Sequence, residues 1–127
     1  MSDPYIKQAR LMERLFQLTQ DKKLDWKVDP FDDEVSCLFS THKIVINDRR
    51  DSDGSPYVHV SIKSLSGSEV DSFTDNDLSE ATLSVPGIDS YWKLMNELLR
   101  MARRQSKGAD EAIDNILNEL DDKEIPF

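Results

Sequence analysis

The sequence contains a single cysteine and no long apolar run. Cys37 alone excludes an intramolecular disulfide and a metal site built only from cysteines. A membrane helix needs roughly 20 consecutive apolar residues, and no such run occurs. The first residues, MSDPYIKQAR, lack the apolar centre of a signal peptide. We therefore expect a cytoplasmic protein with no membrane association.

The sequence also lacks the motifs of common catalytic sites. It has no glycine-rich phosphate loop, no dinucleotide-binding fingerprint and no nucleophile elbow. Its two histidines, His42 and His59, fall on solvent-facing positions of predicted strands, without the cysteine or spaced carboxylate of a metal site. Cys37 stands beside Leu38 in a strand pattern, which favours a buried apolar role over a nucleophile. We expect no enzymatic activity, no cofactor and no metal.

Two loop segments carry several carboxylates, the residues that bind cations. The segment DRRDSDGSP fails as a calcium loop because, with Gly54 in sixth position, the first position is Arg49. We interpret it as a polar hairpin loop. The segment TDNDLSE gathers Asp75, Asp77 and Glu80, which are also ordinary residues of a loop or a helix cap. A shared divalent ion is the less favoured interpretation.

The hydrophobic pattern predicts one α+β domain over residues 1–120. An N-terminal helix over 2–20 carries apolar residues at helical spacing. Alternating β-branched and aromatic residues then predict an antiparallel sheet of three to five strands, because no connection suits a parallel crossover. Two C-terminal helices follow, the first running from Asp89 to a stop at Gly108. The expected architecture has two layers, and residues 121–127 form an acidic tail.

The net charge of −9 is unevenly distributed along the chain. Residues 110–127 hold seven acids and one lysine, a balance of −6 that leaves −3 for the rest of the chain. An acidic balance normally argues against nucleic-acid binding. Here it does not exclude a basic face on the folded body.

One cationic cluster stands out near the end of the first C-terminal helix. Its four bases recur at a spacing that places them on one helix face. Such a stripe suits phosphates, and a tryptophan or an exposed strand aromatic can stack on a base. The competing interpretation is that the bases complement the helix dipole and pair with nearby acids. The candidate nucleic-acid-binding residues are Trp92, Arg100, Arg103, Arg104 and Lys107.

The final residues, DDKEIPF, combine acids with two large apolar side chains. A basic rim would attract the acids, Pro126 restricts both itself and Ile125, and Phe127 supplies a large anchor. The alternative is that Ile125 and Phe127 fold back on the domain as a latch. The candidate partner-docking residues are Asp121, Asp122, Glu124, Ile125, Pro126 and Phe127.

This tail resembles the C-terminal tip of bacterial single-stranded-DNA-binding proteins, where an acidic run ends in Ile-Pro-Phe or a close variant. The resemblance covers residues 121–127 only, and Lys123 departs from the all-acid pattern. It implies recruitment of genome-maintenance proteins such as helicases and exonucleases. The body lacks the strand pattern of a Greek-key barrel and the linker of that family. It looks like a diffuse group of small bacterial or phage proteins, a likeness that carries no activity.

These features favour a non-enzymatic accessory protein of DNA metabolism. It would bind single-stranded DNA, dock on genome-maintenance proteins through its tail, or do both. The alternative is an acidic interaction module without nucleic-acid binding, such as an immunity protein, an antitoxin or a phage inhibitor. The acids that would then cover a basic partner are Asp21, Asp25, Asp29, Asp32, Asp33 and Glu34. The sequence leaves open the partner and whether the chain forms a homodimer.

Overall fold

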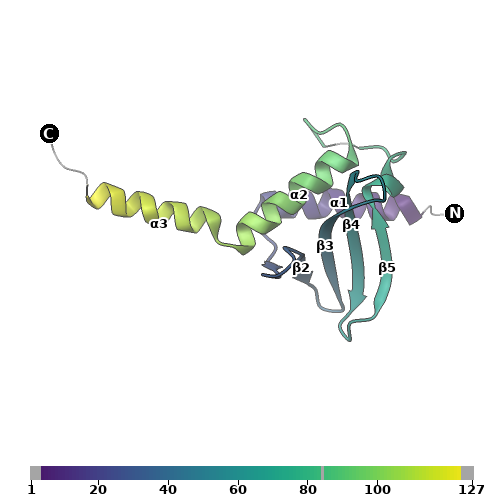
Figure 1. Cartoon of the computed structure of the whole chain (residues 1–127), viewed down its shortest axis with the longest axis horizontal. Coiled ribbons are helices and arrows are strands. Elements are labelled where there is room, and N and C mark those ends of the chain that lie inside the picture. The colour runs from purple at the N-terminus through teal and green to yellow at the C-terminus, as the bar shows by residue number, and fades with distance from the viewer. Residues whose placement is uncertain (1–3, 84, 124–127) are drawn as a thin grey trace.

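The computed structural model describes residues 4–83 and 85–123, which form three α-helices, five strands and one 3-10 helix (Figure 1). The elements follow in the order α1 (Pro4–Gln20), β1 (Trp26–Val28), β2 (Val35–Leu38), β3 (His42–Arg50), β4 (Pro56–Ser64), β5 (Glu69–Thr74), η1 (Asp75–Leu78), α2 (Tyr91–Ser106) and α3 (Ala109–Asp122). The predicted α+β order is confirmed. The long β-rich segment before the polar loop divides into two strands, β2 and β3.

The five strands form one antiparallel meander in the order β1-β2-β3-β4-β5. The longest pairing joins β3 to β4 from His42↔Ser64 to Arg50↔Pro56. The polar loop between these strands is a hairpin turn, as the sequence predicts. In it, one carboxylate oxygen of Asp51 accepts the backbone N–H groups of residues 53 and 55 at 2.9 and 3.0 Å.

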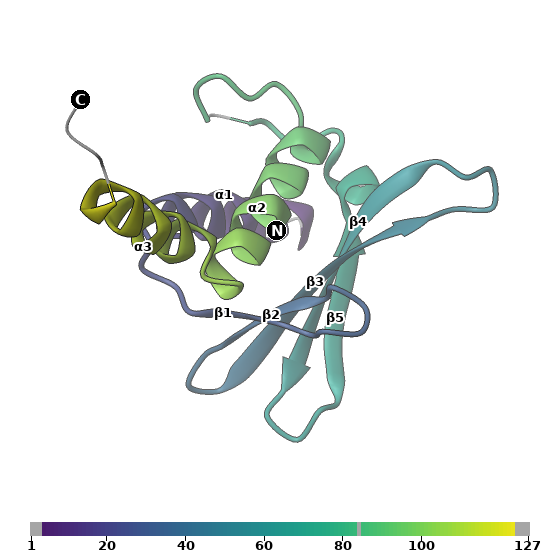
Figure 2. The same cartoon turned by 60° about the vertical axis from the view of Figure 1, so that its left-hand side comes forward.

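Helices α1 and α2 pack together on one face of the sheet (Figure 2). The apolar stripe of α1 enters the core as predicted, except that Tyr5, at its N-terminal end, is 46% exposed. Buried Thr19 joins three elements: its hydroxyl accepts from the Trp26 indole N–H at 3.0 Å, and its carbonyl accepts from Gln105 Nε2 at 2.7 Å. Cys37 is buried in this core, and burial raises the pKa of its thiol, as expected for an apolar role.

Helix α3 leaves this packed body. Gly108, with φ of 67°, lies between α2 and α3 in the left-handed region that favours glycine. The helix then projects away from the sheet (Figure 1), and none of its residues is buried. The predicted domain of residues 1–120 included this helix, whereas the core of the described chain ends with α2. None of the described helices has the length and apolarity to cross a bilayer.

Candidate functional site

The structure brings the five predicted nucleic-acid-binding residues together. Trp92, Arg100, Arg103, Arg104 and Lys107 all line one surface hollow of about 750 Å³ along α2, here called the α2 hollow. Helical spacing explains the gathering, because residues three and four apart share a face. The Trp92 side chain remains partly exposed at 43% and offers a stacking surface.

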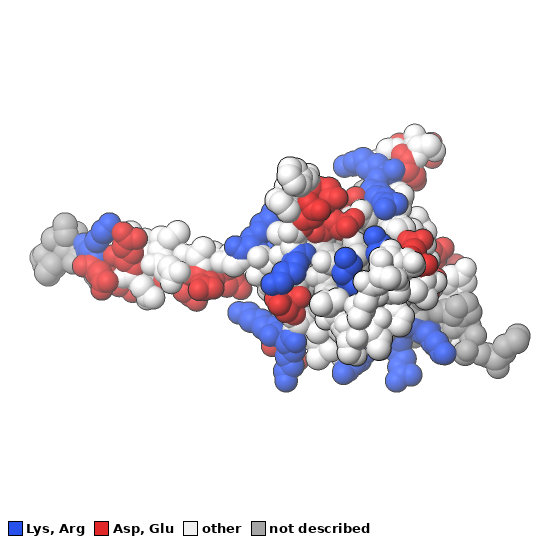
Figure 3. All heavy atoms as spheres, turned by 90° about the horizontal axis from the view of Figure 1, so that it is seen from below, with Lys and Arg blue, Asp and Glu red and all other residues white. Residues whose placement is uncertain are grey.

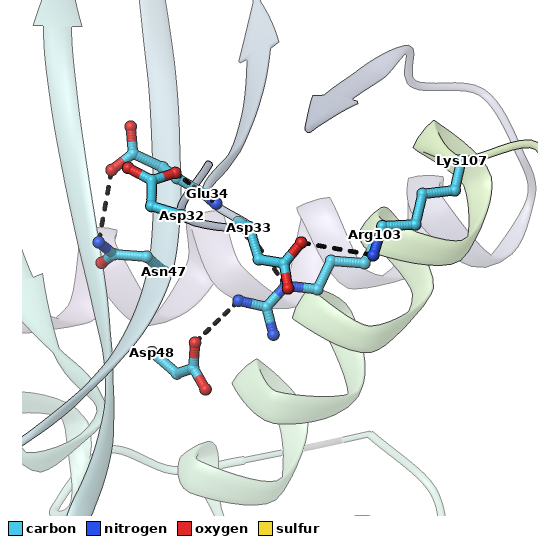
Figure 4. Close-up of polar contacts among 7 residues, drawn as sticks. All are labelled: Asp32, Asp33, Glu34, Asn47, Asp48, Arg103 and Lys107. Carbon is cyan, nitrogen blue, oxygen red and sulfur yellow. Dashed lines mark hydrogen bonds and ion pairs between the residues drawn. The ribbon is translucent and has the colours of Figure 1, made fainter. Parts of the chain in front are cut away.

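Two cations of the α2 hollow hold the neighbouring loop before β2 (Figure 4). The Arg103 guanidinium donates to the Asp33 carbonyl at 2.9 Å and to the Asp48 carboxylate at 2.8 Å. Lys107 Nζ lies 3.4 Å from the Asp33 carboxylate. The hydrogen bond from Arg103 lowers the pKa of Asp48 below its usual value. The Arg103 guanidinium thus already donates to two protein groups.

The other two cations are also paired. Arg100 Nε donates to Glu97 at 3.0 Å on the same helix, and Arg104 donates to Asp110 in the first turn of α3 at 2.8 Å. Lys22 lies 3.6 Å from the same Asp110 carboxylate. The hydrogen bond from Arg104 lowers the pKa of Asp110. The four predicted cations therefore each have an acidic partner, which is the competing interpretation that the sequence left open.

Helix α3 forms a second candidate site because its apolar side lies in solvent. The apolar stripe consists of Ile113, Ile116, Leu117 and Leu120, whose exposure runs from 48% to 58%. Acidic side chains also lie along α3 (Figure 3). A surface helix normally turns its apolar stripe toward a core, and contiguous exposed apolar residues typically mark an interaction site. The helical spacing of these residues is visible in the sequence, but it does not tell that no other described element covers them.

The predicted docking tail begins at the end of this helix. Asp121 and Asp122 close α3 and are exposed. The remaining predicted docking residues, Glu124, Ile125, Pro126 and Phe127, lie outside the described residues. Lys123, the departure from the all-acid pattern, has its Nζ 2.8 Å from the Glu119 carboxylate. Its charge is thus offset locally.

A third feature is the acidic loop over residues 29–34. The Asp29 carboxylate accepts the Phe31 N–H at 2.8 Å, and the Asp32 carboxylate accepts the Glu34 N–H at 3.0 Å. Asp33 has a φ of 58°, in the left-handed region. The Phe31 side chain projects from this braced loop and is 97% exposed. Sequence reasoning counted the acids here and missed the aromatic residue between them.

Two of the three carboxylates of the segment TDNDLSE have structural roles. Buried Asp75 accepts the Val58 N–H at 2.8 Å, and Asp77 caps η1 by accepting the Thr74 N–H at 2.9 Å. Within the described ranges, no group of three histidine, cysteine or acidic side chains could hold a metal ion.

No protein-family model, no curated protein and no solved structure matches this chain. The fold and the geometry of its surfaces therefore carry the functional argument.

Proposed function

We propose that the protein is a non-enzymatic, cytoplasmic accessory factor of DNA metabolism that docks on a genome-maintenance protein through α3 and the tail that follows it. The observation that carries this proposal is the exposed apolar stripe of α3. An isolated helix of 14 residues is marginal in water even with favourable composition. A partner groove that covers the stripe would both stabilise the helix and remove its apolar side from water.

The size of the stripe sets the strength of this contact. Full burial of a large aliphatic side chain contributes about 1.5–3 kcal/mol. The four stripe residues are already half covered, so docking adds roughly 3–6 kcal/mol in total. A millimolar complex requires about 4 kcal/mol, and association itself costs free energy. The helix alone therefore binds weakly, and the apolar pair Ile125 and Phe127 would be needed for useful affinity.

The charge of α3 selects the kind of partner. Besides Asp110, the helix carries four exposed acids, Glu111, Asp114, Glu119 and Asp121, and Asp122 closes it. Two copies pairing through this stripe would bring these like charges together, which disfavours a helix-to-helix homodimer. A groove with a basic rim would attract them and accelerate encounter. The link to DNA metabolism rests on the resemblance of residues 121–127 to the tip of single-stranded-DNA-binding proteins.

A competition assay tests the docking. A purified helicase or exonuclease that binds the tip of single-stranded-DNA-binding proteins is loaded with a fluorescent tip peptide, and this chain is titrated in. We expect displacement by the native chain, none after deletion of residues 125–127, and at least tenfold weaker displacement by Ile116→Glu/Leu120→Glu. Ile6→Glu is the matched control, because Ile6 is 61% exposed on α1 and should leave displacement unchanged.

Failure of the native chain to displace the peptide contradicts the proposed partner class. Equal displacement by the native chain and the α3 variant contradicts the role of the stripe. In that case the tail alone would account for binding to the partner.

The braced loop over residues 29–34 favours a second candidate function, an acidic interaction module that covers a basic protein. Phe31 would anchor such a contact, since aromatic residues are enriched in the core of protein interfaces. Asp33 already pairs with Lys107, which leaves Asp29 and Asp32 as the neighbouring acids. Phe31→Ser would then abolish binding to a partner that the α3 variant still binds.

A further inference from the structure

The face of the sheet opposite α1 and α2 carries no helix of the described chain (Figure 2). Successive side chains of a strand point to opposite faces, so the residues between the core positions of β3 and β4 belong to this outer face. Val45 confirms the assignment because it is buried but lies outside the core cluster. The outer-face residues of the two central strands are Lys43, Val45, Asn47 and Arg49 on β3 and Tyr57, His59, Ser61 and Lys63 on β4.

The outer face holds three cations, Lys43, Lys63 and Arg49, at positions that the strand register gives. Lys43 and Lys63 occupy directly opposed positions of β3 and β4, an arrangement that destabilises a sheet. Neither ammonium group, nor the Arg49 guanidinium, forms an ion pair with a described residue. Glu69 of β5 is paired with Lys63 in the register, and its carboxylate accepts from the Ser61 hydroxyl at 2.6 Å without forming an ion pair with Lys63. In the α2 hollow, by contrast, each of the four predicted cations has an acidic partner.

Aromatic side chains accompany the cations at both ends of this face. Tyr57 is paired with Arg49 in the register and is half-buried. Phe39, in the turn that precedes Lys43, is 38% exposed. Arg49 lies six positions after Lys43, a span of about 20 Å along β3. Between the two ends, Val45 and Ser61 are paired in the register and both are buried.

We propose that the outer face binds single-stranded nucleic acid, with phosphates at Lys43, Lys63 and Arg49 and a base stacked on Tyr57. Basic residues interleaved with aromatic residues on an open sheet are the combination that holds unpaired strands. A duplex keeps its bases stacked on each other, and an acidic peptide has no base to stack. The inference rests on the DNA-linked role proposed above and gives it a surface distinct from the α2 hollow.

The test uses the full chain and a fluorescein-labelled oligo(dT), with anisotropy measured over a range of salt concentrations. Lys43→Glu/Lys63→Glu should weaken binding by about tenfold or more and reduce the salt slope by about 1.4, the value for two lost phosphate contacts on a single strand. The matched control is Lys93→Glu/Lys107→Glu, which makes the same two changes in the α2 hollow and should alter binding less than twofold.

A second pair of variants isolates stacking. Tyr57→Leu should weaken binding severalfold, whereas Tyr57→Phe should retain it, because the ring carries the contact. Melting temperatures of all variants show whether each still folds. Duplex DNA and poly-glutamate serve as competitors and should displace oligo(dT) poorly.

Three results would overturn the inference: no binding by the native chain, equal loss in the sheet and hollow variants, or displacement by poly-glutamate as effective as by oligo(dT). These results leave the docking assay of α3 untouched. Conversely, loss of docking in that assay with intact oligo(dT) binding would refute only the proposed partner.

Discussion

Removing α3 and the tail should leave the body as stable as the intact chain. The perturbation is a chain of residues 1–108, which ends at the glycine between α2 and α3. The deleted helix contains no buried residue, so its removal exposes no core side chain. Its contacts with the body include Asp110, which pairs with Arg104 and Lys22 in solvent, where ion pairs contribute little.

The expected change in the free energy of unfolding is about 1 kcal/mol or less, as for other surface changes. Leu98→Ala in the intact chain is the positive control, because Leu98 is fully buried in the core and such a truncation costs about 2–5 kcal/mol. Urea unfolding followed by tryptophan fluorescence measures both, since buried Trp26 reports on the core. Far-ultraviolet circular dichroism should show the loss of helix α3 alone.

A loss of more than about 2 kcal/mol in the 1–108 chain would refute this reasoning. It would mean that α3 or the tail packs on the body, as the latch interpretation requires. A chain of residues 1–123 then assigns the loss to the helix or to the tail. If stability falls only between the intact chain and the chain of residues 1–123, Phe127 or its neighbours form the latch.

Three further predictions concern the fold. Thr19→Val leaves the indole N–H of buried Trp26 without its acceptor, so the free energy of unfolding should fall by about 1–3 kcal/mol. Thr19→Ser keeps a hydroxyl and should retain most of the native stability. Equal stability of the two variants would contradict the role of this hydrogen bond. The hydrogen bond from Arg103 holds the pKa of Asp48 below its unfolded value, so the pair stabilises the fold above about pH 3.9 and this contribution is lost as pH falls through the folded pKa. The stability difference between the native chain and Arg103→Met should therefore shrink on acidification, and a constant difference would exclude the pair as its cause. Burial, and then the charge of Arg49, lowers the pKa of His59, so stability should decline as pH falls below about 6.5, and His59→Gln should flatten that part of the pH profile.

The element order could be predicted because the spacing of apolar residues within each segment indicates a helix or a strand. Helix α1 and the alternating strands bury residues at the expected spacing, and Gly108 ends α2 where the pattern indicates. The sequence did not predict that α3 lies in solvent. An apolar stripe has the same spacing whether it meets its own core or another protein, and only the placement of the other elements decides between them.

The sequence predicted which residues gather in the α2 hollow but not which side chains pair with them. Helical spacing placed the cations beside Trp92 correctly, but the acidic partners of Arg103 and Lys107 come from distant segments. Asp33 lies 70 residues before Arg103, and Asp48 lies 55 residues before it. Local patterns carry no information on such pairs. The sequence also did not predict that Lys43 and Lys63 lie opposite each other, because strand register depends on tertiary structure.

The ion pairs of the α2 hollow connect the two surfaces for which protein partners are proposed. Arg103 and Lys107 bind Asp33, and so fix the loop that presents Phe31. Arg104 binds Asp110 in the first turn of α3, from which the apolar stripe extends. A charge reversal at Arg103 or Arg104 should consequently disturb docking at a surface that the arginine does not itself touch. Arg103, Lys107 and Arg104 thus join the loop and the first turn of α3 to α2, while the nucleic-acid-binding role of this cluster stays a prediction.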